Sequence, residues 1–433
     1  MLGQPRWARR VALAAVGAAL VAAAALAGAT LLRAAPAPER IVLVVIDTLR
    51  RDRVGAYGAS VPTPHLDAFA AEGAVFRRAT SAFNLTTLSM AALFTGRTPS
   101  VESQVPGQPL PWTGHTWCGL SRLAASRAEP CVPSGVPTLA EELRRASYPG
   151  VGVVSNLLLF RPAGFDRGFD EWIEIGPNAA QTRSAQAGEP IAYDPAHQAG
   201  DVVNRAVRDW LARRPGDRFF LYVHYMDVHD WFMTKTPYDE AVRRVDRHVG
   251  ELRALLDEAG LLEGSVVVIT SDHGEGLREQ HALSALPTHM GNPSFRPVLA
   301  VPLIVWPRID ADPDALVRSD DTFRLIRTLA RVDGEAAEKD LAQGKLFLTE
   351  RLFRTYRQGR WKSVWPRGQE DPVLLDLEQD PGELRNVAAE HPERLVAHRE
   401  RVEALSRKLG AETRAAAPTA ENLERLRALG YVE

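Results

Sequence analysis

The sequence Ile41-Val-Leu-Val-Val-Ile46 is apolar throughout and is followed at once by Asp47. An unbroken apolar run of this kind, rich in β-branched residues, predicts a strand buried on both faces of a parallel sheet. Similar runs follow at wide spacing at 151–154, 219–223 and 265–270, and helical patterns lie between them at 139–145, 201–213 and 238–259. The alternation of strands and helices predicts an α/β layered domain.

Three of these predicted strands end in side chains that bind metals. Asp47 follows the first, Asp227 and His229 follow the run at 219–223, and Asp272 and His273 follow the run at 265–270. In parallel sheets, ligands gather beyond the carboxyl ends of the strands. Carboxylates and imidazoles at one sheet edge therefore predict a catalytic metal centre.

The composition limits the class of protein. The chain has 433 residues, of which 45% are hydrophobic and 24% charged, so it can bury one large core or a main domain with a smaller one. The formal net charge is only -2, which provides no extended basic field. We therefore expect no nucleic-acid partner.

The N-terminus predicts a membrane anchor. Residues 11–32 carry no charge and follow Arg6, Arg9 and Arg10. The stretch is long enough to cross a bilayer, and the basic flank predicts a cytoplasmic N-terminus. Cleavage near Ala35-Pro36-Ala37 is the alternative. In both cases the rest of the chain lies outside the cytoplasm, on the periplasmic or cell-exterior side, where Cys118 and Cys131 are expected to form a disulfide.

The domain organisation follows from these patterns. We expect an anchor with its basic flank at 1–37, a catalytic domain at 38–345 and a C-terminal subdomain at 346–410. In the subdomain, short strands are predicted at 345–349, 359–365 and 373–375, and a helix at 392–409. Residues 411–433 are predicted to be a linker and a short terminal helix.

The chain resembles the sulfatase family within the alkaline-phosphatase superfamily. The resemblance rests on ordered motifs along nearly the whole chain after the anchor: Ile46-Asp-Thr-Leu-Arg-Arg-Asp-Arg-Val-Gly-Ala-Tyr-Gly58, Thr63-Pro-His-Leu-Asp-Ala-Phe-Ala-Ala-Glu-Gly73, Leu93-Phe-Thr-Gly-Arg97, Gly164-Phe-Asp-Arg-Gly-Phe-Asp170, Phe219-Phe-Leu-Tyr-Val-His-Tyr-Met-Asp-Val-His229, Ser271-Asp-His-Gly-Glu275, Val301-Pro-Leu-Ile304 and Leu426-Arg-Ala-Leu-Gly-Tyr-Val432. It implies an alkaline-phosphatase/sulfatase-like three-layer sandwich with a small C-terminal α+β subdomain.

The sequence departs from the family's sulfatases at the nucleophile. Sulfatases carry Cys-x-Pro-Ser-Arg there, and counting back from Arg97 places Thr86 at the cysteine and Met90 at the arginine. Asn156 and Leu158 stand where the family's sulfate-binding lysine and histidine are expected. A threonine at this position is similar to the phosphodiesterase and phosphoethanolamine- or glycerophosphate-transferase branches of the superfamily.

The resemblance also implies roles for site residues. A metal held by Asp47, Asp272 and His273 would contact Thr86 and activate its hydroxyl as the nucleophile. His289 falls near the position where relatives place a lysine or a metal-binding histidine, so it is predicted to be a ligand or a general acid. With Asp227 and His229, it would hold a second ion.

Several alternatives stay open at these positions. Thr87 and Ser89 are rival hydroxyls, and Thr86 itself would be a helix cap if it is not the nucleophile. His224 is interpreted as a satisfied core histidine, and His281 is undecided. Trp112, Trp117 and Trp231 either line a substrate mouth or pack in the core. The ligands favour one or two ions of zinc or manganese, with calcium and magnesium as alternatives.

The sequence therefore predicts a metal-dependent hydrolase or transferase that cleaves a phosphate ester through a Thr86-linked intermediate. A sulfatase with an unusual nucleophile and a non-catalytic anion-binding protein are the alternatives. The expected substrate is a small anionic ester or an envelope-linked molecule. The sequence does not determine the oligomeric state.

Overall fold

The computed structural model describes residues 37–97, 132, 135–176, 199–213, 216–283, 289, 295–332, 353–366 and 371–409. Within it, Glu39–Glu433 form one compact unit. The predicted membrane span at 11–32 and both cysteines, Cys118 and Cys131, lie outside the described residues. Among the described residues, no helix combines the length and the apolar character that crossing a membrane requires.

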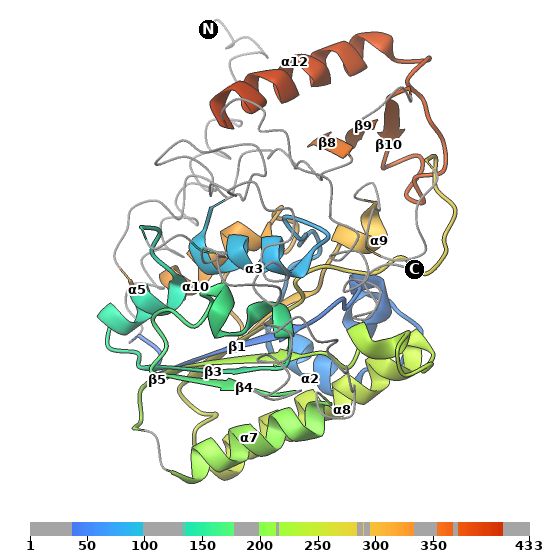
Figure 1. Ribbon diagram of the computed structural model, residues 1–433. Helices are drawn as coiled ribbons and strands as arrows, with labels where there is room; N and C mark the ends of the chain where they lie inside the picture. Colours follow the sequence, from blue (N-terminus) through green and yellow to red (C-terminus); the bar gives the residue numbers. More distant parts are fainter. Residues whose placement is uncertain are drawn as a thin grey trace, which may run out of the picture. The chain divides into compact units, whose positions relative to one another are not determined.

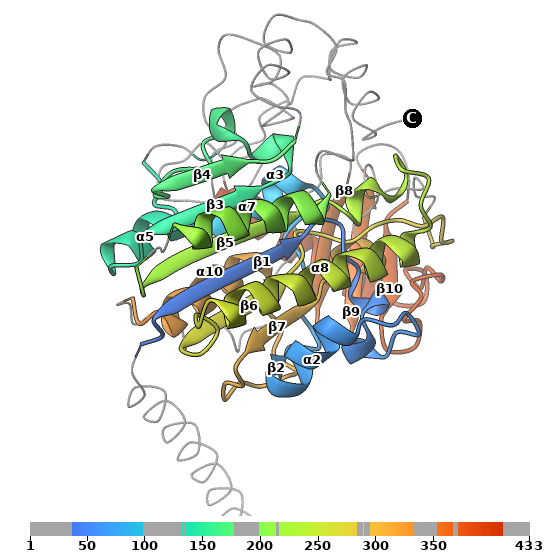
Figure 2. The same ribbon diagram turned by 90° about the horizontal axis from the view of Figure 1, so that it is seen from below.

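A seven-stranded sheet forms the centre of the unit, in the order β2-β7-β6-β1-β5-β3-β4 (Figures 1 and 2). Its strands are β1 (Arg40–Ile46), β2 (Ala74–Val75), β3 (Gly150–Val154), β4 (Glu171–Glu174), β5 (Phe219–Tyr225), β6 (Ser265–Thr270) and β7 (Leu303–Trp306). The strands from β6 to β4 run parallel, as predicted. The sheet is nevertheless mixed, because β7 is antiparallel to β6 and β2 is antiparallel to β7.

The apolar run at 41–46 becomes β1, which lies between β5 and β6 and is buried along its whole length. Its side chains alternate between two cores. Ile41, Leu43 and Val45 belong to the core on one face of the sheet, and the intervening residues belong to the core on the other. A strand covered on both faces has no solvent-facing side, which explains why the run contains no polar residue.

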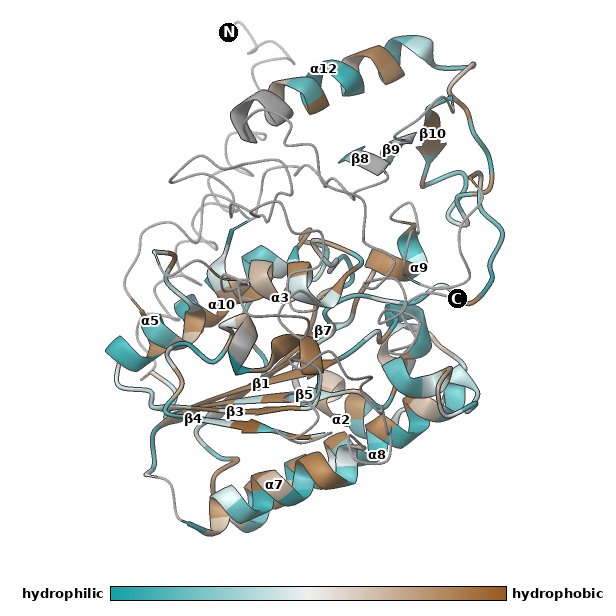
Figure 3. Cartoon of the chain, viewed as in Figure 1, coloured by the Kyte–Doolittle hydropathy of each residue, from teal (hydrophilic) through white to brown (hydrophobic). Residues whose placement is uncertain are grey.

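Helices cover both faces and make three layers. On one face lie α3 (Thr86–Thr95), α5 (Leu139–Arg145) and α10 (Ser319–Leu329), and on the other lie α2 (Pro64–Glu72), α7 (Gly200–Ala212) and α8 (Tyr238–Glu258). Figure 3 shows hydrophobic strands between helices that are partly hydrophilic. Shorter helices are η1 (Arg51–Arg53), η2 (Gly55–Tyr57), η3 (Leu157–Leu159), η4 (Arg161–Ala163), η6 (His229–Trp231) and α9 (Arg296–Leu299).

The C-terminal part forms a separate antiparallel sheet, β8 (Phe353–Gln358), β9 (Trp361–Pro366) and β10 (Val373–Asp376), followed by α12 (Pro392–Leu409). Val364, Val373 and Leu375 of this sheet share a small core with Phe295. The strands predicted at 359–365 and 373–375 and the helix at 392–409 are present. The strand predicted at 345–349 and the terminal helix lie outside the described residues, and β8 was not expected. The domain boundary at residue 345 stays a prediction.

Candidate metal centre and nucleophile

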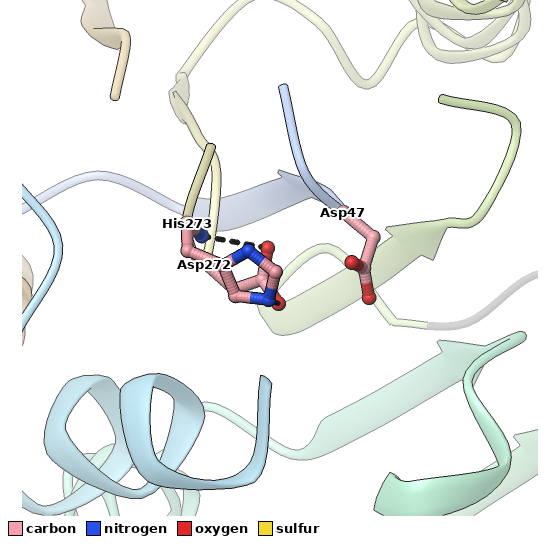
Figure 4. A group of neighbouring side chains, drawn as sticks. All are labelled: Asp47, Asp272 and His273. Atoms are coloured by element: carbon pink, nitrogen blue, oxygen red, sulfur yellow. Dashed lines mark hydrogen bonds and ion pairs between the residues drawn. The ribbon is translucent and has the colours of Figure 1, made fainter. Parts of the chain in front are cut away.

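The residues predicted at the ends of two strands meet at one point. β1 and β6 are parallel neighbours, so Asp47, Asp272 and His273 emerge at the same sheet edge. One ligand atom from each residue lies within 4.8 Å of the others, and all three side chains are buried (Figure 4). Two carboxylates and an imidazole at this separation form a ligand set for a divalent cation.

Each carboxylate has one oxygen fixed by the protein. Asn156 Nδ2 donates to Asp47 Oδ2 at 2.7 Å, and His224 Nε2 donates to the same oxygen at 3.0 Å. The backbone amides of Thr48 and His273 donate to Asp272 Oδ1 at 3.1 and 2.8 Å. These bonds hold the two carboxylates in a fixed orientation, as supporting hydrogen bonds do around metal ligands.

The other oxygen of each carboxylate makes no hydrogen bond within the described residues: Asp47 Oδ1 and Asp272 Oδ2 are both buried. His273 Nε2 lies 3.4 Å from Asp272 Oδ2 but makes no hydrogen bond to it. A buried carboxylate oxygen without a hydrogen bond is unfavourable, and a cation would compensate for it. Burial raises the pKa of Asp47, but the hydrogen bond from His224 and the charges of His229 and His273 outweigh burial and hold that pKa below its usual range. Asp47 is therefore a carboxylate at neutral pH, as a metal ligand must be.

A strained turn follows β1. Thr48 has φ +58°, a left-handed conformation that is uncommon for a β-branched residue. This conformation lets its N–H reach Asp272, while its C=O accepts a hydrogen bond from the Tyr238 hydroxyl at 2.6 Å. The strained conformation thus allows the hydrogen bonds that connect the end of β1 to the turn after β6 and keep both carboxylates in place.

Thr86 lies beside this group. It is the first residue of α3, and the N-cap position belongs to Leu85, which provides no side-chain cap. Thr86 is therefore not a cap, and its Oγ1 lies 3.3 Å from His273 Nε2. The rival hydroxyl of Ser89 is held elsewhere, because it contacts Ser81 Oγ and the Phe83 carbonyl, each at 2.8 Å. The helix start also points backbone N–H groups and the positive end of the helix dipole at the group.

Two further histidines lie around the group. The His289 ring lies 4.4 Å from the His273 ring and 6.0 Å from the His229 ring, measured between centroids. His289 Nδ1 lies 3.1 Å from Glu275 Oε1, and His229 Nδ1 lies 3.1 Å from Asp230 Oδ1. Each histidine thus has its Nδ1 oriented by a carboxylate.

The two histidines differ in their protonation. Burial lowers the pKa of His229, but the hydrogen bond with Asp230 and the charge of Asp47 outweigh it and raise the pKa of His229 to about 9. Burial, opposed by Glu275 and reinforced by the charge of His273, lowers the pKa of His289. At neutral pH, His229 is therefore an acid that can donate a proton and His289 is a neutral base.

Asp227 is not part of this group, contrary to the prediction that it joins His229 and His289. Its Oδ1 lies 3.4 Å from His248 Nε2 on α8, on the α7/α8 face of the sheet. An added Cβ on Gly200 of α7 would lie 2.9 Å from its Oδ2, which places the carboxylate close to that helix as well. The chain turns after β5, so residues two apart in the sequence face different sides.

The sequence also missed supporting residues. His224 is buried and satisfied, as interpreted, but its partner is Asp47, and its Nδ1 lies 2.6 Å from the Tyr222 hydroxyl. Asn156 was named only as the residue at the position of a sulfate-binding lysine, and Glu275 lies at the end of the motif 271–275 without an assigned role. Met90, at the position of the sulfatase arginine, is completely buried in the core.

The remaining candidates lie elsewhere. Trp231 packs against Tyr238, and its Nε1 lies 3.4 Å from Glu275 Oε2, so it borders the group on one side. His281 stacks on Phe295 at 3.9 Å and lines a separate cavity. Trp112 and Trp117 lie outside the described residues.

Comparison with known proteins gives a consistent result. The model of the family described as Sulfatase matches residues 39–331. N-acetylgalactosamine-6-sulfatase of Canis lupus familiaris is 30% identical over 286 residues, which cover 56% of this chain and 51% of the canine protein. N-acetylgalactosamine-6-O-sulfatase of Bacteroides thetaiotaomicron is 22% identical over 82% of this chain and 90% of its own. The chain spans about half the length of the mammalian relatives that it matches.

Among solved structures, the phosphonate monoester hydrolase of Agrobacterium radiobacter aligns with a TM-score of 0.59 and 16% identity over 86% of this chain and 96% of that chain. A Bacteroides thetaiotaomicron protein of glycosaminoglycan metabolism aligns with a TM-score of 0.61 and 19% identity over 86% of this chain and 100% of that chain. At these identities the alignments show a common fold.

Proposed function

Because this chain belongs to the sulfatase family, we propose that it is a metal-dependent hydrolase or transferase that cleaves a phosphate ester through an intermediate on Thr86. One observation carries the proposal: the Thr86 hydroxyl, at the start of α3, lies 3.3 Å from His273 in the buried Asp47–Asp272–His273 group. No cysteine stands at this position, so the aldehyde nucleophile of ordinary sulfatases cannot form there.

Asp47, Asp272 and His273 would hold the cation, with Thr86 beside them. A bound cation would lower the pKa of a nearby hydroxyl and offset charge on the ester oxygens. Zinc or manganese suits a ligand set that contains imidazole. Because Asp227 contacts His248 on α8, a second ion would draw on His229 and His289 among the ligands predicted for it, and His229 would have to lose its proton to bind.

The chain's own residues account for the remaining steps. The Thr86 oxygen forms a bond to phosphorus while the bond between phosphorus and the leaving oxygen breaks. His229, protonated at neutral pH, gives its proton to the leaving oxygen, and His289 can accept one from the incoming nucleophile. The N-terminal N–H groups of α3 stabilise the non-bridging oxygens. Water at the second step makes the protein a hydrolase, and an alcohol makes it a transferase.

A sulfate ester is the second candidate, because the relatives described above include two N-acetylgalactosamine-6-sulfatases. Two positions where sulfatases have positively charged sulfate-binding side chains are uncharged here. Met90 lies in the core, and Asn156 donates a hydrogen bond to Asp47. We favour the phosphate ester for this reason. A protein that binds an anion without turnover is the third candidate.

We further propose that residues 11–32 anchor the protein in a membrane and that the unit Glu39–Glu433 lies outside the cytoplasm. The uncharged stretch and the preceding arginines support this proposal. An envelope-linked ester would then be within reach of the site.

The test compares aryl phosphodiester, phosphomonoester and sulfate-ester substrates with the purified full chain loaded with manganese or zinc. We expect phosphoester turnover, and we expect Thr86→Ala to lower it by at least about 1000-fold because the nucleophile is removed. Thr87→Ala is the matched control and should retain most activity. Preference for the sulfate ester, or activity that survives Thr86→Ala, would contradict the proposal, and absence of all turnover would favour the binding protein.

A further inference from the structure

A second cavity lies beside the C-terminal sheet and has no role in the steps above. Its volume is about 500 Å³, which is within the range of small-molecule sites. Arg51, Arg296 and His281 line it, together with Asp52 and Glu279. The cavity therefore has ionisable residues on several sides.

The carboxylates of this cavity already have partners. Arg50 forms ion pairs with both Asp52 and Glu279. Glu383 of the C-terminal part forms an ion pair with Lys362 at 2.9 Å. The single charge of Arg50 offsets only one of the two carboxylates that it contacts, so one negative charge is left at the cavity.

Three arginines at this place have no such partner. Arg51, Arg296 and Arg357 form no ion pair within the described residues, and their side chains donate hydrogen bonds to the backbone carbonyl oxygens of Arg77, Pro381 and Gly359. These three positive charges exceed the one carboxylate charge that Arg50 leaves unbalanced. The cluster therefore carries an excess of positive charge.

Arg51 and Arg296 both line the cavity, and the pKa shifts agree with repulsion among the three arginines. Burial and the charge of Arg296 lower the pKa of Arg51. Burial, with the charges of Arg78 and Arg296, lowers the pKa of Arg357 to about 10. Half-buried guanidinium groups that repel one another are unfavourable until an anion is placed between them.

The cavity is also close to the metal centre along the chain. Arg51 follows Asp47 by four residues, so their Cα atoms are at most about 14 Å apart. Glu279 follows Glu275 by the same number of residues, and Arg50 joins the two segments through the Glu275 carbonyl at 3.2 Å. The Asp47–Arg51 segment and the Glu275–Glu279 segment therefore each connect the metal group to the cavity through four residues.

We propose that this cavity is a second anion-binding site, which takes a phosphate- or sulfate-type group carried either by the substrate itself or by a free anion. The planar donor array of arginine suits the oxygens of such groups. The proposal deepens the function proposed above, and only the first of the two sources depends on that function.

The binding test uses the full chain with Thr86→Ala and without metal, so that its outcome does not depend on turnover. Inorganic phosphate and tripolyphosphate are titrated by calorimetry. We expect Arg296→Gln to weaken binding by at least about 10-fold, since it removes charged hydrogen-bond donors, and Arg296→Lys to weaken it less. The Arg296 side chain is exposed, so these variants should fold. Arg205→Gln, an exposed arginine on α7, is the matched control and should leave the affinity unchanged.

A second experiment identifies whether the bound anion belongs to the substrate or is free in solution. Two aryl phosphoesters are compared, one of which carries an extra phosphate on a linker of roughly 10 to 14 Å, the reach worked out above. If the extra group lowers KM in the unmodified protein but not in Arg296→Gln, the substrate carries the anion. Equal KM values together with phosphate binding at Arg296 identify a free anion. Absence of anion binding, or the same affinity in Arg296→Gln, would overturn the proposal.

Discussion

Metal binding should stabilise the fold by an amount that the structure allows us to work out, and Asp272→Asn should remove this effect. Asp272 Oδ1 accepts two backbone hydrogen bonds, which an asparagine oxygen can retain, whereas Oδ2 has no hydrogen-bond partner in the described part of the chain. The variant therefore keeps the local fold and loses a ligand atom. Without metal it should be at least as stable as the unmodified protein, because one of two adjacent buried carboxylates is gone.

The magnitude follows from linkage. Free metal at about 100 times its Kd adds about 2.7 kcal/mol to the free energy of unfolding. A unit of roughly 400 residues unfolds with an entropy of about 0.8 kcal/mol per kelvin, so Tm should rise by about 3 °C.

Calorimetric melting with and without zinc or manganese measures this shift. Asp246→Asn is a matched control, because Asp246 accepts hydrogen bonds from the backbone at the start of α2, away from the metal group. The control should keep the full shift. A shift that persists in Asp272→Asn, or its absence from the unmodified protein with every divalent metal, would refute the assignment of the site.

Three further variants test core packing, acid stability and the orientation of a metal ligand. Gly152→Ala should lower the free energy of unfolding by about 1–3 kcal/mol, because its Cβ would lie 2.3 Å from the buried Trp172 ring, and chemical denaturation measures the loss. Burial lowers the pKa of His398 to about 4, so the fold favours the neutral form of this side chain. The stability that depends on it is complete above pH about 6.5 and is lost as the pH falls towards 4. His398→Phe should therefore reduce the acid dependence of Tm. Asn156→Ala should weaken metal binding by about 10- to 100-fold, measured by metal titration, because Asp47 loses an orienting donor.

Each of these variants has an outcome that would contradict its reasoning. Gly135→Ala, where an added Cβ meets nothing within 4 Å, should be neutral, so an equal loss at both glycines would exclude the steric explanation. An unchanged pH profile in the His398 variant would show that other groups dominate acid unfolding. Metal affinity that is unaffected in the Asn156 variant would show that Asp47 is oriented without it.

Much of the central sheet could be predicted because strands buried on both faces leave continuous apolar runs. Asp47, Asp272 and His273 could be predicted for the same reason, since each follows such a run directly. The antiparallel β7 and β2 were not predicted, because short strands at a sheet edge leave a weak pattern.

The position of Asp227 has a physical cause beyond the strand pattern. Tyr225, the last residue of β5, continues the face of Val223, but Asp227 lies in the turn after the strand, where alternation no longer applies, and its Oδ1 lies 3.4 Å from His248 on α8. His224 faces the other side and reaches Asp47. His229 returns to the site only because the chain turns into η6 (His229–Trp231), and no periodicity predicts that turn.

The second cavity required the three-dimensional structure. Arg51, Arg296 and Arg357 come from three distant segments and carry no common motif. Contacts of this kind between distant segments depend on how the C-terminal sheet packs, which local patterns do not determine.

The most direct test of the account is to trap the covalent intermediate on Thr86. The metal-loaded protein is quenched during turnover of an aryl phosphoester, digested and examined by mass spectrometry. The account predicts one phosphoryl group on the peptide that contains Thr86, retained in Thr87→Ala and absent in Thr86→Ala. Turnover without any adduct, or an adduct on another residue, would contradict it.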